Sequence, residues 1–295
     1  MSLQTLQSQE EMIKQVRKFA ESLTKLRTVK PIEEYYAGPV LFEDGAALGV
    51  FTSNLFAPQT ALIAGRTRID RQAAPTIENR IGKKIIDSRL TVKNYSTLAK
   101  YNNTQLMGAY EIDAEGVVPE KEITLVENGI MRRMLNSRVP TLKNPTSTGS
   151  SRYVLSATDI AFVTAPGTVH ISVSKGIKHD KMKKELIKAV KEEGLEYGYI
   201  VRKNAGLATQ IFRVSAKDGS ETQVGACSVA KVELAKIKRL LAVSSRENVA
   251  NIILNNATLA SFIYPSAILV DDVEINKTDA KKSQAPSLEF PLKRQ

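Results

Sequence analysis

The stretch YYAGPVLFEDGAALGVFTSNLFAP, residues 35–58, decides the fold. Its Gly-Pro pair predicts a rigid turn, and the apolar run that follows predicts a short strand. From Glu43 to Phe56 the sequence predicts a helix with small and apolar residues on its inner side, namely Ala46, Ala47, Val50 and Phe51. Pro58 ends this helix, because proline lacks the backbone N–H that a helix interior needs.

Most of the chain downstream predicts strands. The clearest pair is a hairpin, 122–126 and 130–135, whose connection contains Asn128-Gly129, a pair that tolerates the positive φ of a tight turn. Further strands are predicted at 160–164, 169–173, 197–202, 209–215, 222–233 and 267–275. Helices are predicted at 180–194, 234–241 and 248–254. Regular strand–helix alternation is missing, so we expect an α+β fold, with a mainly antiparallel, barrel-like sheet and a few flanking helices.

An amphipathic helix is predicted over 9–29. Its apolar residues recur at spacings of four, three, four and three, which places them on one face: Met12, Val16, Phe19, Leu23 and Leu26. We expect this face to dock on the chain's own domain; a coiled coil is the alternative, although sustained heptads are missing. The predicted organisation is an N-terminal connector helix (1–31), one large domain (32–277) and a polar tail (278–295).

The chain has 295 residues, 42% of them hydrophobic, and a formal net charge of +11. Such a charge attracts acidic partners, including nucleic acid, but the densest lysine run, 175–191, has no interleaved aromatic residues and is typical of a solvated helix face. A single cysteine excludes an internal disulfide. The apolar windows are too short to span a bilayer, so we expect a cytoplasmic protein without membrane contact.

Common catalytic motifs are missing from the sequence. The two histidines, His170 and His179, lie nine residues apart, which is not the spacing of zinc ligands on a helix. Cys227 lies in a strand-like run and is typical of a small core residue. No Gly-x-Ser-x-Gly, Walker-type or Gly-x-Gly-x-x-Gly pattern occurs. A Ser-His-Asp arrangement stays open, because triads assemble in space rather than in sequence.

Several segments, taken in order, resemble the C-terminal domain of the TldD/PmbA family, metallopeptidase-related proteins described as modulators of DNA gyrase. Four of these segments are YAGPVLFE at 36–43, LVENGI at 125–130, TGSSR at 148–152 and PSAILV at 265–270. The others are 46–47, 82–86, 90–92, 113–117, 166–167, 193–195 and 240–249. The resemblance spans roughly 35–275 and implies that the first helix is a connector to a separate N-terminal domain, which this sequence does not contain.

The chain departs from this family at the positions of the metal ligands. Catalytic members that resemble TldD carry His-Glu-x-x-x-His on the helix after the apolar strand, where this chain has LGVFTSNLFAP at 48–58. A third ligand of the family, a cysteine near the C-terminal end, has no counterpart in 250–275. The resemblance therefore implies a lost metal motif, no catalytic residue and no zinc in this chain, and we expect the cleft there to be apolar or blocked. The lost motif falls at Phe51, Thr52, Ser53, Asn54, Leu55 and Phe56.

The resemblance favours a non-catalytic subunit that holds unfolded peptide or assembles, as a homo- or hetero-oligomer, with a TldD/PmbA-type subunit. Peptide contacts are expected from Thr148, Gly149, Ser150 and Arg152. The first alternative is an active metallopeptidase whose ligands come from a partner or from the missing N-terminal domain. A nucleic-acid-binding module, which the net charge and the lysine run suggest, is the second alternative and ranks below the first.

Overall fold

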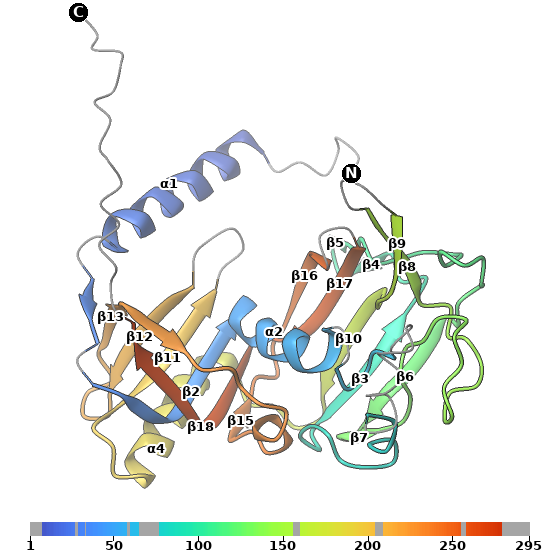
Figure 1. Cartoon of the computed structure of the whole chain (residues 1–295). Helices are drawn as coiled ribbons and strands as arrows, with labels where there is room; N and C mark the ends of the chain where they lie inside the picture. Colours follow the sequence, from blue (N-terminus) through green and yellow to red (C-terminus); the bar gives the residue numbers. More distant parts are fainter. Residues whose placement is uncertain are drawn as a thin grey trace, which may run out of the picture.

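The computed structural model describes residues 8–26, 29–32, 34–57, 60–64, 77–155, 160–203, 209–254 and 258–278. Its helices are α1 (Gln9–Leu26), α2 (Gly45–Phe51) with the π-helical turn η2 (Thr52–Phe56), η3 (His179–Lys181), α4 (Met182–Glu192) and η4 (Lys236–Lys238). Two curved β-sheets lie side by side, and α2 lies between them (Figure 1). The predicted α+β class is confirmed.

The larger sheet has the strand order β1-β13-β12-β11-β2-β18-β14, and β15 also pairs with β18. Its strands are β1 (Lys30–Pro31), β2 (Tyr36–Asp44), β11 (Tyr197–Lys203), β12 (Gln210–Ser215), β13 (Glu221–Gly225), β14 (Cys227–Val229), β15 (Ala242–Val243) and β18 (Ala267–Lys277). Most pairs are antiparallel, as predicted, but β2 lies parallel to β11 and β1 parallel to β13.

The second sheet has the order β16-β17-β10-β3-β6-β7. Its strands are β3 (Leu90–Tyr95), β6 (Glu122–Glu127), β7 (Ile130–Met131), β10 (Thr168–Val173), β16 (Glu247–Leu254) and β17 (Thr258–Pro265). Two small hairpins, β4–β5 (Lys100–Tyr101, Thr104–Gln105) and β8–β9 (Ser151–Leu155, Ile160–Thr164), complete the described strands. The chain passes from the second sheet to the first at Ser266, between β17 and β18.

The predicted strand–helix unit at 35–58 forms β2, α2 and η2. Alternate residues of β2 face opposite sides of its sheet: Val40 and Phe42 join the main core, whereas Leu41 packs in a smaller cluster under α4. The inner side chains predicted for the helix are buried, and so is Leu48. β2 therefore sits at the centre of the core and fixes where α2 begins.

The predicted hairpin is confirmed, with β6 and β7 joined through Asn128 and Gly129, whose φ values are 47° and 80°. Its second arm, predicted at 130–135, is a strand only over 130–131. The helix predicted at 248–254 is wrong, because these residues form β16 and pair with β17 over their whole length. At 234–241 only the short turn η4 is helical. Ala226, with φ of 49°, divides the strand predicted at 222–233 into β13 and β14.

α1 forms where the apolar stripe predicts a helix, but its described apolar side chains are exposed, and Val16 is 66% accessible. Docking of α1 on its own domain is therefore wrong for the described residues. The chain runs from α1 to β1, which is an edge strand of the larger sheet, and the helix extends away from the core (Figure 1). The side chains of Leu23 and Leu26 lie outside the described residues. The predicted polar tail also lies outside them after Thr278. None of the described helices is long and apolar enough to cross a membrane.

Candidate functional site

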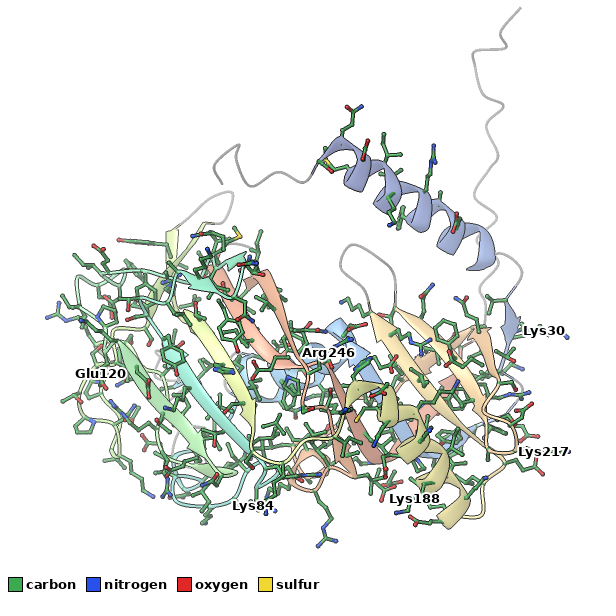
Figure 2. All side chains as sticks on the ribbon, turned by 180° about the vertical axis from the view of Figure 1, so that it is seen from behind. Lys30, Lys84, Glu120, Lys188, Lys217 and Arg246 are labelled. Carbon is green, nitrogen blue, oxygen red and sulfur yellow. The ribbon has the colours of Figure 1, made fainter. Side chains whose placement is uncertain are left out.

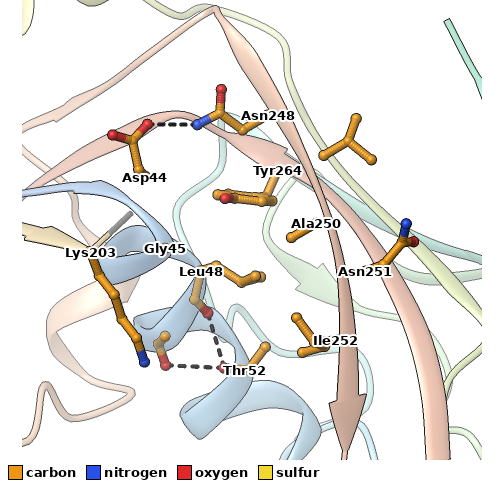
Figure 3. A pocket seen from close by; sticks show the side chains of 12 residues that line it. Asp44, Gly45, Leu48, Thr52, Lys203, Asn248, Ala250, Asn251, Ile252 and Tyr264 are labelled. Atoms are coloured by element: carbon orange, nitrogen blue, oxygen red, sulfur yellow. Dashed lines mark hydrogen bonds between the residues drawn. The ribbon is translucent and has the colours of Figure 1, made fainter. Parts of the chain in front are cut away.

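A cavity of about 680 Å³ opens where α2 faces the strand β16. One wall comes from Leu48, Gly49 and Thr52, and the other comes from residues 248–252 of β16 (Figure 3). Asp44, Lys203 and Tyr264 lie at the end nearest the start of α2. The cavity is open, with both polar and apolar lining residues, so the prediction of an apolar or blocked cleft is wrong.

Of the six residues at the lost metal motif, only Thr52 lines this cavity. Its hydroxyl donates to the carbonyl of Leu48 at 3.0 Å, so its oxygen is held close to the helix. Phe51, Leu55 and Phe56 are buried in the core. Asn54 is also buried, and its amide donates to the carbonyls of Val50 at 2.9 Å and Val232 at 2.8 Å.

β16 is the terminal strand of its sheet. Its one strand partner among the described residues is β17, so its other side presents backbone N–H and C=O groups without a neighbouring strand. Asn248 and Asn251 hold this strand in place. Asn248 donates to the carboxylate of Asp44 at 2.8 Å, and Asn251 donates to the carbonyl of Gln105 at 2.9 Å.

Asp44 marks the junction of β2 and α2 and has φ of 53°, a left-handed conformation that is uncommon outside glycine. Its backbone N–H donates to the carbonyl of Ser266 at 2.8 Å, and Arg246 approaches its carboxylate at 3.7 Å. Desolvation, with the Asp44 charge as a smaller cause, raises the pKa of the neighbouring Tyr264 to about 12. Tyr264 therefore stays protonated at neutral pH and can offer its hydroxyl as a hydrogen-bond donor.

The side chains at this cavity do not match a zinc-peptidase site. A catalytic zinc normally takes three protein ligands from histidine, cysteine and carboxylate groups. Asp44 is the one residue of these types in the described lining, and no group of three such residues occurs elsewhere in the described residues. We derive no metal-dependent step from this donor set.

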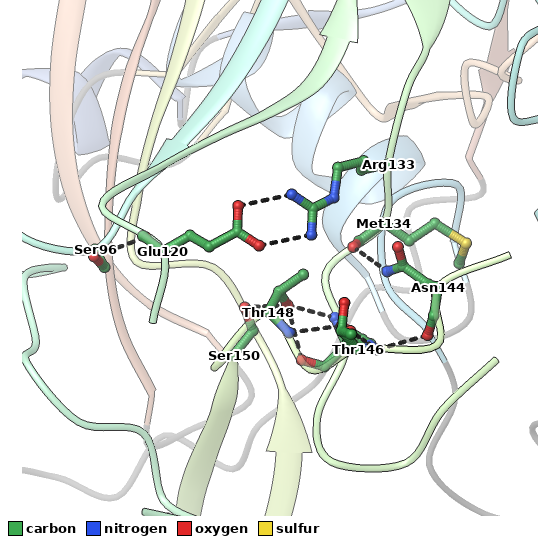
Figure 4. Close-up of polar contacts among 9 residues, drawn as sticks. Ser96, Glu120, Arg133, Met134, Asn144, Thr146, Thr148 and Ser150 are labelled. Atoms are coloured by element: carbon green, nitrogen blue, oxygen red, sulfur yellow. Dashed lines mark hydrogen bonds and ion pairs between the residues drawn. The ribbon is translucent and has the colours of Figure 1, made fainter. Parts of the chain in front are cut away.

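The predicted peptide contacts at 148–152 divide into two groups. Thr148 and Ser150 are buried and joined by a hydrogen bond of 2.9 Å (Figure 4). Thr148 also exchanges hydrogen bonds with Asn136. Gly149 has φ of 64°, and a Cβ there would lie 2.6 Å from Pro119. These three residues fold the loop on itself, whereas Arg152 reaches a separate pocket.

The two histidines do not meet. His170 contacts the carboxylate of Glu247 at 2.7 Å, and the same carboxylate accepts a hydrogen bond from Tyr101 at 2.5 Å. His179 contacts the buried hydroxyl of Ser266 at 2.8 Å, at the passage between the two sheets. Cys227 is half-buried, and desolvation raises the pKa of its thiol, which is the opposite of what a reactive cysteine needs.

The lysine run does not form an uninterrupted basic surface. Lys183 pairs with Glu221 at 2.8 Å, and Lys188 approaches Glu192 at 3.9 Å. Lys188 lies on the outer side of α4, turned away from the sheet (Figure 2). This arrangement is that of the solvated helix face that the sequence predicts.

Sequence reasoning missed the β16 wall of the cavity, together with Asp44, Lys203 and Tyr264. The helix predicted at 248–254 hid the edge strand, although Val249, Ile252 and Ile253 are β-branched and favour a strand. Gly45 is a second sequence feature that could have indicated this site. A Cβ at this position would lie 2.7 Å from the carbonyl oxygen of Lys203, so glycine lets α2 start against β11.

The fold and the cavity define an α+β domain in which a helix after the central strand faces an open cleft. Residues 36–277 match the PmbA/TldA metallopeptidase C-terminal domain, and the chain belongs to this family. A comparison with curated proteins found no match.

Solved structures share the fold. TldE from Thermococcus kodakarensis is 16% identical, with a TM-score of 0.57, over 88% of this chain and 55% of that one. A candidate modulator of a DNA gyrase from Thermotoga maritima is 15% identical, with a TM-score of 0.57, over 87% and 53%. A similar protein from Bacteroides thetaiotaomicron is 14% identical, with a TM-score of 0.52, over 88% and 51%. The chain therefore spans about half the length of these proteins.

Proposed function

We propose that this chain is a non-catalytic member of its family that holds an extended peptide in the α2–β16 cleft and assembles with a TldD/PmbA-type subunit. The observation that carries the proposal is the edge strand β16, which forms one wall of an open 680 Å³ cavity. The opposite wall has Thr52, which is one of the six positions of the lost metal motif.

The cleft suits a peptide main chain better than a particular side chain. A peptide that adds to β16 forms hydrogen bonds through its backbone, which every sequence provides. The eight residues of β16 extend over about 27 Å at the usual rise per residue of a strand. The cavity adds apolar contacts from Leu48 and Ile252 and polar contacts from Asn248 and Tyr264.

Assembly is supported by the apolar stripe of α1. Met12, Ile13, Val16 and Phe19 are exposed in the isolated chain, and a contiguous apolar face of this kind marks an interaction surface. We propose that a TldD/PmbA-type subunit, or a second copy of the chain, covers it.

Binding of unstructured peptides and light scattering after size-exclusion chromatography test this function. We expect an oligomer, or a complex with a TldD/PmbA-type subunit, that binds a labelled unstructured peptide. The matched probe is the same peptide with alternate backbone nitrogens methylated, which removes donors but keeps every side chain. We expect it to bind at least tenfold more weakly, because it loses hydrogen bonds worth about 1 kcal/mol each. A strict monomer that binds neither peptide nor subunit would refute the proposal.

An active metallopeptidase is the alternative, with zinc ligands supplied by a partner or an N-terminal domain. The family match favours it, and the cleft is large enough for a substrate. Metal analysis of the purified chain, alone and in complex with a sister subunit, distinguishes the two. A built zinc site holds its metal tightly through purification. The described residues form no such site, so we expect less than about a tenth of an equivalent of zinc in the chain alone. Stoichiometric zinc with peptide cleavage would favour the alternative.

A further inference from the structure

A second pocket, of about 290 Å³, lies beside the start of β8. Arg152 lines it together with Tyr110 and Leu259, which come from other parts of the chain. The Arg152 guanidinium carbon is 4.0 Å from the centre of the Tyr110 ring, and the guanidinium donates to the carbonyl of Leu259 at 3.1 Å. These contacts fix the orientation of a partly buried cation at the wall of a pocket.

Among the described residues, no carboxylate oxygen lies within 4.0 Å of the Arg152 guanidinium. Other partly buried arginines differ in this respect. Arg89 pairs with Asp87 at 2.8 Å, Arg133 with Glu120 at 2.7 Å, and Arg202 with Glu221 at 2.7 Å. A partly buried cation that no described carboxylate neutralises costs free energy, and an anion that enters the pocket would recover it.

Asp113 lines the same pocket but is committed to the backbone. Its carboxylate accepts hydrogen bonds from the N–H groups of Glu115 at 2.9 Å, Val117 at 2.8 Å and Ser151 at 3.1 Å. Three of its roughly four acceptor positions are therefore occupied. Desolvation lowers the pKa of Arg152, and the more distant Asp113 charge opposes this shift without removing it.

The rim of the pocket is apolar. Ile112 is 61% accessible and Tyr153 is 53% accessible, and Leu259 is exposed beside them. A ligand that fits both features has a carboxylate for the guanidinium and an apolar group for the rim. The end of a peptide chain with an apolar last residue has this combination.

We propose that the Arg152 pocket binds the carboxylate of a peptide, and that its main ligand is the α-carboxylate of an apolar C-terminal residue. The guanidinium forms paired N–H···O bonds to the two carboxylate oxygens, and the last side chain packs on Ile112, Tyr153 and Leu259. The inference rests on the proposed function for the class of ligand, but it concerns a pocket other than the α2–β16 cleft.

The test compares fluorescein-labelled hexapeptides that end in leucine, as the free acid and as the amide, by fluorescence anisotropy with the full chain. We expect the free acid to bind at least tenfold more tightly, because hydrogen bonds between charged groups are the strong ones. Arg152→Gln is expected to remove the difference, and Arg152→Lys to keep part of it. Arg213→Gln is the matched control, because Arg213 also lies over a tyrosine ring, that of Tyr197, at 5.0 Å. It is expected to keep the full difference.

Two further probes separate the outcomes. An amidated peptide that ends in glutamate tests whether a side-chain carboxylate binds. If it binds as tightly as the free acid, the pocket still binds a carboxylate through Arg152, but its ligand is an acidic side chain. N-acetylleucine tests the pocket without the cleft, so its Arg152-dependent binding would support the inference even if long peptides do not bind. Equal binding of acid and amide to the unaltered chain, or a difference that survives Arg152→Gln in a folded variant, overturns the inference.

Discussion

Asp87→Ala is expected to lower the free energy of unfolding by about 3 kcal/mol at pH 7, because it leaves a partly buried cation without its partner. Asp87 is only 5% exposed and accepts four hydrogen bonds. Three come from the backbone N–H and guanidinium of Arg89, at 2.8 to 3.0 Å, and one comes from the backbone N–H of Leu240 at 2.9 Å. The carboxylate thus ties the start of β3 to a segment about 150 residues later.

Urea unfolding followed by circular dichroism measures this loss. The control is Glu127→Ala, which removes a carboxylate paired with Arg132 at 3.0 Å where both side chains are about half exposed. An exposed pair of this kind contributes at most about 1 kcal/mol. Equal losses for the two variants would show that burial of Asp87 does not add to its contribution.

The same carboxylate predicts how stability depends on pH. Desolvation raises the pKa of Asp87, but the hydrogen bonds from Arg89 and Leu240 outweigh it, so the pKa is lowered in the folded chain. The stabilisation is therefore complete above the unfolded-state pKa of about 3.9 and is lost as the pH falls through the lower, folded-state pKa. The difference in unfolding free energy between the unaltered chain and Asp87→Ala should be constant from about pH 7 to 5 and shrink below about pH 4. A difference that does not change between pH 5 and pH 3 would contradict this assignment.

The parts of the fold that sequence predicts well are those that local chemistry determines. The β2–α2 unit follows from the apolar run after Pro39 and the small residues of the helix, because each of these acts over a few residues. The Asn128-Gly129 turn is local in the same way. The turn predicted at Gly38-Pro39 is wrong, because both residues lie inside β2. The strand β16 was predicted as a helix, because its β-branched residues are only a weak local signal and its pairing with β17 involves residues outside the segment.

The candidate site is non-local throughout. Asp44 and Asn248, joined by a hydrogen bond of 2.8 Å, lie 204 residues apart in the chain. The family resemblance located the helix that carries Thr52, but no pattern indicated which strand would face it. For the loop at 148–152 the sequence indicated the right segment but not the role of each residue. Its motif was recognised, but burial separates Thr148 and Ser150, which support the loop, from Arg152, which lines a pocket.

Gly108→Ala is the second substitution for which we expect a loss of about 3 kcal/mol. Gly108 lies against the backbone of Gly167, just before β10, and of Ser261 in β17. A Cβ at this position would lie 2.2 Å from the carbonyl oxygen of Gly167 and 2.9 Å from the backbone nitrogen of Ser261. Both atoms belong to backbone, and the Ser261 N–H donates to the same Gly167 carbonyl at 3.0 Å. The sheet cannot move aside without losing this bond, so the methyl group has to displace the segment that contains Gly108.

Gly49→Ala is the matched control and should have the opposite sign. Gly49 lies inside α2, its φ is not positive, and a Cβ there would meet no atom within 4 Å. Alanine in a helix interior is more stable than glycine by roughly 0.5–1 kcal/mol, because the unfolded chain loses conformational freedom. The two variants carry the same added methyl group, so a difference of about 4 kcal/mol between their unfolding free energies isolates the close approach. If Gly108→Ala costs less than about 1 kcal/mol, the backbone approach at Gly167 is looser than the structure shows, and the second sheet must accommodate the segment in another way.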